Sequence, residues 1–150
     1  MSTRKKGNDF QRWIKTWLEL HGWTVRNFPV SIRPIRTPKG LVYAGAKVDV
    51  WGADLCARKP HRLIWVQASC SGGVKKRVEE YRQHFSDLLE GEDLLIFLKT
   101  PKGPVNVKRL VPLGMGRSFA LSGKLADAVT VEDCGKIILR KWYSASGWEF

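Results

Sequence analysis

The sequence predicts a single α/β domain in which a mixed sheet is flanked by helices. The chain of 150 residues has the usual size of one domain and can bury one sizeable core. Apolar residues recur at helical spacing in two segments, 8–22 and 74–91, and short alternating or wholly apolar segments lie between and after them. Strands that alternate with helices in this way are typical of a sheet with helices packed against it.

The first helix is expected to begin at Asn8 or Asp9, either of which can cap a helix, and to stop at Gly22. Its apolar positions follow the helical repeat at Phe10, Trp13, Ile14, Trp17 and Leu20. Residues 1–7 are then a flexible basic arm in front of the domain.

The segment after this helix is expected to form a strand, a loop and a hairpin. "WTVRNFPVSI", residues 23–32, alternates as a strand does, and the prolines and glycine of "RPIRTPKG", residues 33–40, predict a basic loop. "KVDVWGADLCARKPHRLIWVQAS", residues 47–69, is predicted to be a hairpin that turns at Pro60 and His61.

The second half is expected to contribute another helix and at least two strands. The helix spans residues 74–91 and ends at Gly91, "DLLIFLK" is a strand covered on both faces, and "KIILRKWY", residues 136–143, is a final strand. Residues 101–135 show weak periodicity. The core order is therefore αβββαβ, with a crossover between the hairpin and "LLIFL".

The charge of the chain indicates a polyanion partner. Lys and Arg number 26 against 14 Asp and Glu, which leaves a formal net charge of +12. No stretch approaches the length of a membrane span, and no hydrophobic segment follows the basic start, so a cytoplasmic protein without a membrane partner is expected. The three cysteines have no metal-ligand spacing and are odd in number, which argues against a zinc site and a disulfide framework.

The order of elements and three short motifs resemble the core of the PD-(D/E)xK nuclease superfamily, which includes Holliday-junction resolvases and many restriction endonucleases. The motifs are "VDVWGADL", "LIWVQAS" and "GGVKKRVEEY", and the resemblance covers residues 8–98. Gln67 and Ser69 make the chain similar to small phage and mobile-element proteins of this group, in which Gln-x-Ser stands in place of Glu-x-Lys. The resemblance implies a restriction-endonuclease-like fold, DNA as the partner, cleavage of branched or junction DNA, and a homodimer.

The hairpin residues suit metal-dependent phosphodiester hydrolysis, which needs a divalent cation held by hard oxygen ligands. A turn at residues 60 and 61 sets Asp54 nearly opposite Gln67, and facing residues on paired strands lie about 5 Å apart. Asp49, five residues before Asp54, would share its face only if Gly52 hosts a bulge. A structural amide within the sheet explains Gln67 equally well.

The resemblance assigns roles to these positions. It implies a site for Mg²⁺ or Mn²⁺ at Asp49, Asp54, Gln67 and Gln11, the last in place of a helical Glu. Ser69 stands where a water-orienting Lys is usual, and Lys76 is the nearby cation that replaces it. DNA contacts are expected from basic residues in three segments: Arg33, Arg36, Lys39, Lys47, Lys75, Lys76 and Arg77.

Two other functions stay open. The substitutions at positions 11, 67 and 69 favour a nuclease-fold module that binds DNA or supports assembly without catalysis. A basic RNA-binding protein of the α/β class is the third hypothesis, and it requires exposed tryptophans for base stacking.

Overall fold

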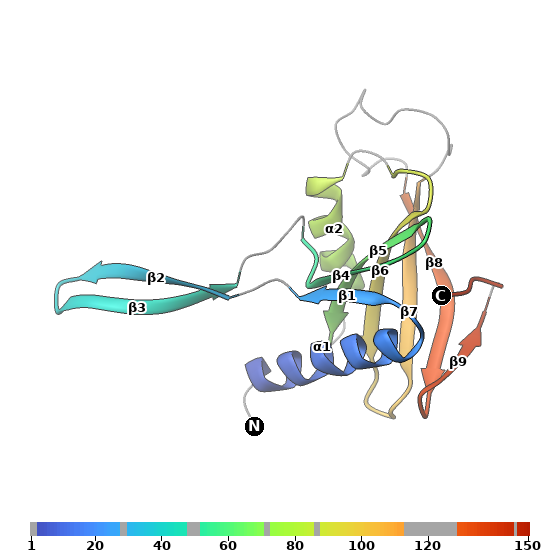
Figure 1. Ribbon diagram of the computed structural model, residues 1–150, viewed down its shortest axis with the longest axis horizontal. Coiled ribbons are helices and arrows are strands. Elements are labelled where there is room, and N and C mark those ends of the chain that lie inside the picture. The colour runs from blue at the N-terminus through green and yellow to red at the C-terminus, as the bar shows by residue number, and fades with distance from the viewer. Residues whose placement is uncertain are drawn as a thin grey trace.

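The computed structural model describes the chain except for residues 1–2, 28–29, 48–51, 71–72, 86–87, 113–128 and 146. Within this part of the chain it contains two helices and nine strands (Figure 1). In chain order they are α1 (Thr3–Leu20), β1 (Thr24–Asn27), β2 (Val30–Thr37), β3 (Gly40–Lys47), β4 (Leu55–Lys59), β5 (Arg62–Ser69), α2 (Val74–His84), β6 (Glu92–Lys99), β7 (Val105–Pro112), β8 (Val129–Ile138) and β9 (Lys141–Ser144).

Seven of these strands form one mixed sheet in the order β1-β4-β5-β6-β7-β8-β9. The neighbours β5 and β6 are parallel and are joined through α2, whereas the other neighbouring pairs are antiparallel. Strands β2 and β3 pair only with each other in the described sheets and form a separate ribbon. The expected α/β class with a mixed sheet and a crossover helix is therefore confirmed.

The sheet is covered on both faces. On one face α1 packs through Phe10, Ile14, Trp17 and Leu18 against alternate residues of the central strands. On the other face α2 packs through Tyr81, and Phe85, directly after the helix, packs beside it. Strand β6 shows the division most clearly, because Leu95 and Phe97 belong to the α1 side, Leu94 and Ile96 belong to the α2 side, and all four are buried. This confirms the prediction of a strand covered on both faces.

The first helix is longer than expected at its start. It ends as predicted, with Gly22 in the left-handed region at φ 86°, but it begins at Thr3. The expected start at Asn8 or Asp9 is wrong, and residues 3–7 belong to the helix. Asn and Asp also occupy interior positions of helices at a small cost in propensity, so Asn8 and Asp9 do not prevent the helix from starting earlier.

The basic loop expected at residues 33–40 is instead most of a hairpin. Arg33–Thr37 lie in β2, and the turn falls at Pro38 and Lys39. Pro34 is paired with Tyr43. A proline removes a backbone donor from the ladder, and a two-stranded ribbon tolerates this because each strand has an open outer edge.

Two elements of the second half also differ from expectation. Helix α2 ends at His84 and not at Gly91, because Phe85 takes an extended backbone, φ −114° and ψ 125°. Its ring packs beside those of Trp65 and Tyr81. The single strand expected at residues 136–143 is a tight hairpin between β8 and β9, whose turn residues Leu139 and Arg140 both have positive φ.

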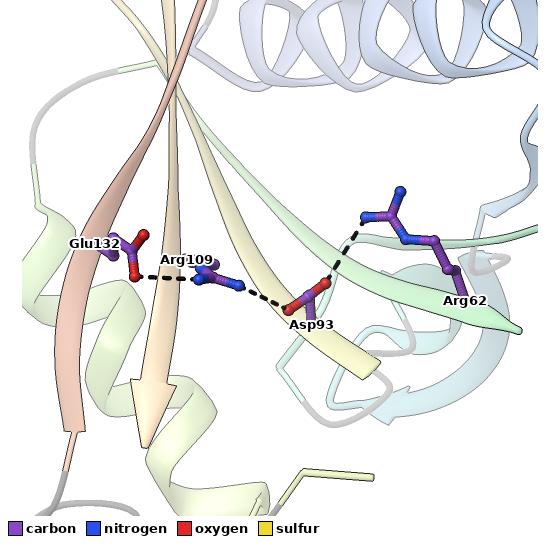
Figure 2. Close-up of polar contacts among 4 residues, drawn as sticks. All are labelled: Arg62, Asp93, Arg109 and Glu132. Carbon is purple, nitrogen blue, oxygen red and sulfur yellow. Dashed lines mark hydrogen bonds and ion pairs between the residues drawn. The ribbon is translucent and has the colours of Figure 1, made fainter. Parts of the chain in front are cut away.

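A chain of ion pairs ties four strands together on the α1 side of the sheet (Figure 2). Asp93 lies 3.9 Å from Arg62 and 3.6 Å from Arg109, and Arg109 contacts Glu132 at 3.2 Å. Burial raises the pKa of Asp93, and the two arginines oppose that shift.

None of the helices in the described structure is long and apolar enough to cross a membrane.

Candidate functional site

The β4–β5 hairpin brings Asp54 close to the backbone of β5 beside Gln67. The two strands turn at Pro60 and His61, as predicted, and Leu55 is paired with Val66. Asp54 directly precedes β4, and its backbone N–H donates to the carbonyl of Val66 at 2.9 Å, the residue that is already paired with Leu55. The ladder is therefore irregular at Asp54, which lies beside Val66 and Ala68 of β5.

The Asp54 carboxylate is buried and bonded to the backbone of β5. Asp54 is only 7% exposed, and its Oδ2 accepts a hydrogen bond from the N–H of Ala68 at 2.8 Å. The carboxylate thus takes the place that a backbone carbonyl would have in a longer β4. A charge-assisted bond of this kind is stronger than one between neutral groups, so Asp54 contributes to the hairpin whatever else it does.

The Gln67 side chain is buried without a hydrogen-bond partner in the described structure. The residue is 0% exposed, and neither Nε2 nor Oε1 has a partner. Buried amides are almost always bonded, because leaving a donor or acceptor unpaired costs about 1–3 kcal/mol. Gln67 is therefore the energetic anomaly of the sheet, and packing alone gives no reason for a polar residue here.

The amide of Gln67 points towards Gly52 and helix α2. A Cβ built on Gly52 would lie 3.5 Å from Gln67 Nε2 and 3.2 Å from the backbone oxygen of Glu80. Gly52 also has φ 79°, which L side chains rarely adopt. Gly52 therefore turns the backbone close against α2, and the bulge expected there stays a prediction. Asp49, which it was expected to realign, lies outside the described residues.

Tyr81 closes the same side of the sheet, and in the sequence it is recognisable only as an apolar position of the second helix. It is fully buried, and its hydroxyl donates to the carbonyl of Leu95 at 2.9 Å. Burial raises the pKa of Tyr81 well above its usual value, the charges of Asp54 and Glu80 raise it further, and Arg77 opposes them. Asp54 therefore acts electrostatically on the space under α2.

Ser69 joins this group from β5. It is 3% exposed and lies two residues beyond Gln67, hence on the same face of the strand. Asp54, Gln67 and Ser69, three of the four hairpin residues singled out from the sequence, are thus gathered at one end of the sheet. Each of the three is buried.

The other predicted residues lie in three places. Gln11 is half-buried on α1, which covers the face of the sheet opposite to α2. Lys75 and Lys76 are exposed in the first turn of α2, and Arg77 pairs with Glu80 at 3.6 Å. Arg33, Arg36, Lys39 and Lys47 belong to the β2–β3 ribbon and its turn.

The donor set at the end of the hairpin is suited to a hard cation, although it is small. A carboxylate and an amide oxygen are the ligand types that Mg²⁺ accepts, and the unpaired Oε1 of Gln67 is the observation that fits such an ion. Groups of three or more His, Cys, Asp or Glu able to hold a metal do not occur within the described residues. Among the described residues, an ion here would therefore depend on Asp54 and Gln67.

Comparisons of the chain with known protein families, with curated proteins and with solved structures find no match. The function therefore has to be inferred from the chemistry of the residues at the end of the β4–β5 hairpin.

Proposed function

We propose that the protein is a metal-dependent DNA endonuclease of the PD-(D/E)xK type. The single observation that carries the proposal is the buried, unpaired amide of Gln67, whose neighbour Ala68 is bonded to the buried carboxylate of Asp54. The order α1, β1, β4, β5, α2, β6 supports it, because it agrees with the αβββαβ core that the resemblance implies, with the β2–β3 ribbon inserted after the first strand.

The residues of this chain would divide the work as follows. Asp54 and Gln67, with Asp49, would hold Mg²⁺ or Mn²⁺, which when bound polarises a phosphoryl oxygen and lowers the pKa of water. Ser69 takes the position of the residue that orients the attacking water. Lys75 and Lys76, exposed at the start of α2, would contact a phosphate where the helix also presents unpaired backbone N–H groups.

A second candidate, a DNA-binding module without catalysis, is favoured by one observation. The hydrogen bond from Ala68 N–H to Asp54 explains the buried carboxylate without any metal. The RNA-binding hypothesis finds less support, because the six described tryptophans are buried or half-buried and pack in the two cores. Base stacking would require exposed rings.

Cleavage of branched and linear DNA with Mg²⁺ and Mn²⁺ distinguishes the two candidates. Asp54→Asn keeps an oxygen that can accept the Ala68 N–H but loses the charge, so it should preserve the fold. If Asp54 binds the metal, cleavage should fall by more than about 100-fold, beyond the 10–100-fold typical of outer-shell partners. Asp9→Asn, on the exposed surface of α1, is the matched control and should cleave as the wild type does.

Binding in EDTA completes the test. The endonuclease proposal is refuted if the wild-type protein binds DNA but cleaves no substrate with either metal. The module without catalysis is refuted if metal-dependent cleavage is observed and is lost in Asp54→Asn.

A further inference from the structure

The β2–β3 ribbon extends away from the rest of the molecule (Figure 1). Its two strands are paired along their whole length, from Val30 with Lys47 to Thr37 with Gly40. Neither strand makes extensive contact with another described helix or strand. Eight residues per strand at about 3.4 Å each give a projection of roughly 27 Å. An element of this length contributes little to the core and is therefore available for a partner.

The ribbon carries basic residues and no acidic ones. Residues 30–47 contain Arg33, Arg36, Lys39 and Lys47 and no Asp or Glu. Lys39 is exposed at the turn, next to Pro38. Positions 33 and 36 have opposite parity along β2, so each face of the ribbon carries a cationic position. A projecting hairpin with this charge is complementary to a polyanion on either side.

We propose that the β2–β3 ribbon is an arm that lies in a groove of duplex DNA and contacts its phosphates through Arg33, Arg36 and Lys39. The choice of DNA rests on the proposed function, whereas the choice of a duplex over a single strand follows from the shape and composition of the ribbon. The major groove of B-DNA, about 12 Å wide, admits a two-stranded ribbon, and the deep, narrow major groove of duplex RNA does not. Residues 30–47 include one aromatic residue, Tyr43, which is a poor platform for successive bases of a single strand.

A second copy of the chain is a less suitable partner. Two chains of formal charge +12 repel each other, and the basic ribbons would add to that repulsion. Prolines and cations on open edges also oppose pairing with another strand. The ribbon has Pro34 in β2, Pro38 in its turn and the four cations named above.

The test compares two triple variants of the whole protein in EDTA, so that cleavage plays no part. Arg33→Ala, Arg36→Ala and Lys39→Ala together remove the arm cations, and Lys102→Ala, Lys136→Ala and Lys141→Ala remove three exposed cations elsewhere. Fluorescence anisotropy with a labelled linear duplex gives affinity as a function of salt. Losing three phosphate contacts should reduce the magnitude of the slope of log affinity against log salt by about 2.7. Between 50 and 200 mM salt, the factor by which affinity falls should therefore be about 40 times larger for the wild type than for the arm variant.

Each outcome decides the inference. It is supported if the arm variant loses this slope and the control does not, and it is overturned if both variants bind duplex DNA as the wild type does or lose affinity equally. A wild-type preference for single strands or duplex RNA also overturns it, as does a dimer that sedimentation shows to be lost only in the arm variant. The single variant Lys39→Ala at the exposed turn, expected to lower the slope by about 0.9, serves if the triple variant is misfolded.

Failure of this inference is distinguishable from failure of the proposed function. An arm variant with unchanged binding refutes the arm but leaves metal-dependent cleavage by Asp54 untouched. A wild-type protein that never cleaves, but whose salt slope depends on the arm, refutes the endonuclease and retains the arm.

Discussion

Replacing Gln67 by methionine is expected to make the protein more stable and less active. The amide is fully buried, with both polar atoms unpaired in the described structure. Methionine has nearly the same length and no strong hydrogen-bonding atom, so Gln67→Met removes the unpaired groups without opening a cavity. If the amide serves a ligand and not the fold, its removal should benefit the fold.

The expected size of the effect follows from the two unpaired atoms. Each buried group without a partner costs about 1–3 kcal/mol, and a volume-conserving swap in a core costs less than about 1.5 kcal/mol. Relieving two such groups gains about 2–6 kcal/mol, so after the cost of the swap the free energy of unfolding should rise by about 0.5–6 kcal/mol. For a chain of this size, each kcal/mol moves Tm by about 2–4 °C, so a shift of roughly 1–24 °C is expected.

Urea and thermal denaturation measure this change, with Gln83→Met as the matched control. Gln83 is exposed on α2, and its replacement should alter stability by less than about 0.5 kcal/mol. Adding Mg²⁺ at 100 times its dissociation constant should stabilise the wild type by about 2.7 kcal/mol and the variant much less. A Gln67→Met protein that is destabilised by more than 1 kcal/mol, roughly the worth of one hydrogen bond, would show that the amide is bonded in the fold, and the reasoning would be wrong.

Three further changes test other parts of the structure. Gly7→Ala should raise the free energy of unfolding by about 0.5–1 kcal/mol, because Gly7 lies inside α1 and an added Cβ meets no atom within 4 Å; no gain in urea denaturation would contradict a helix that begins at Thr3. Tyr81→Phe should cost about 0.5–1.5 kcal/mol at neutral pH, since it removes the buried hydrogen bond from the Tyr81 hydroxyl to the Leu95 carbonyl. Because the pKa of Tyr81 is raised, its contribution is complete below the ordinary value and is lost as pH rises through the folded value, so the stabilities of variant and wild type should converge in alkali. Asp93 also has a raised pKa, so the stability of the wild type relative to Asp93→Asn should be highest below about pH 4. This difference should fall by at most about 1.4 kcal/mol per pH unit as pH rises through the folded pKa. A difference that stays constant with pH would contradict the raised pKa.

Local signals were sufficient for the hairpin that holds the site. The polar pair Pro60 and His61 between two apolar segments indicated the turn, and the register from that turn pairs Leu55 with Val66, one residue from each of Asp54 and Gln67. The apolar run of β6 likewise predicted a strand covered on both faces. In each case the deciding information lies within a few residues along the chain.

Features that depend on tertiary packing were not predictable. The helical repeat of α2 continues through Phe85 to Leu89, but the backbone leaves the helix at Phe85, and Leu89 is 70% exposed. The β8–β9 turn uses Leu139 and Arg140 at positive φ, where Asn-Gly would have been the recognisable sequence. The burial of the site under α2 depends on the close approach of Gly52 to Glu80, which no local pattern encodes.

Asp54 and Gln67 are both buried polar residues under α2, but only Asp54 has a structural reason for being there. The surrounding residues are apolar, among them Ala53, Trp65 and Tyr81, so stability alone favours an apolar residue at position 67. Asp54 differs because its carboxylate is bonded to Ala68 N–H, and Asp54→Ala should therefore cost about 1–3 kcal/mol even if no metal ever binds. Loss of cleavage in Asp54→Ala is thus ambiguous, whereas a Gln67→Met protein that is both more stable and inactive has no structural explanation. The Gln67→Met variant is therefore a sharper test of the endonuclease proposal than a substitution of the Asp54 carboxylate.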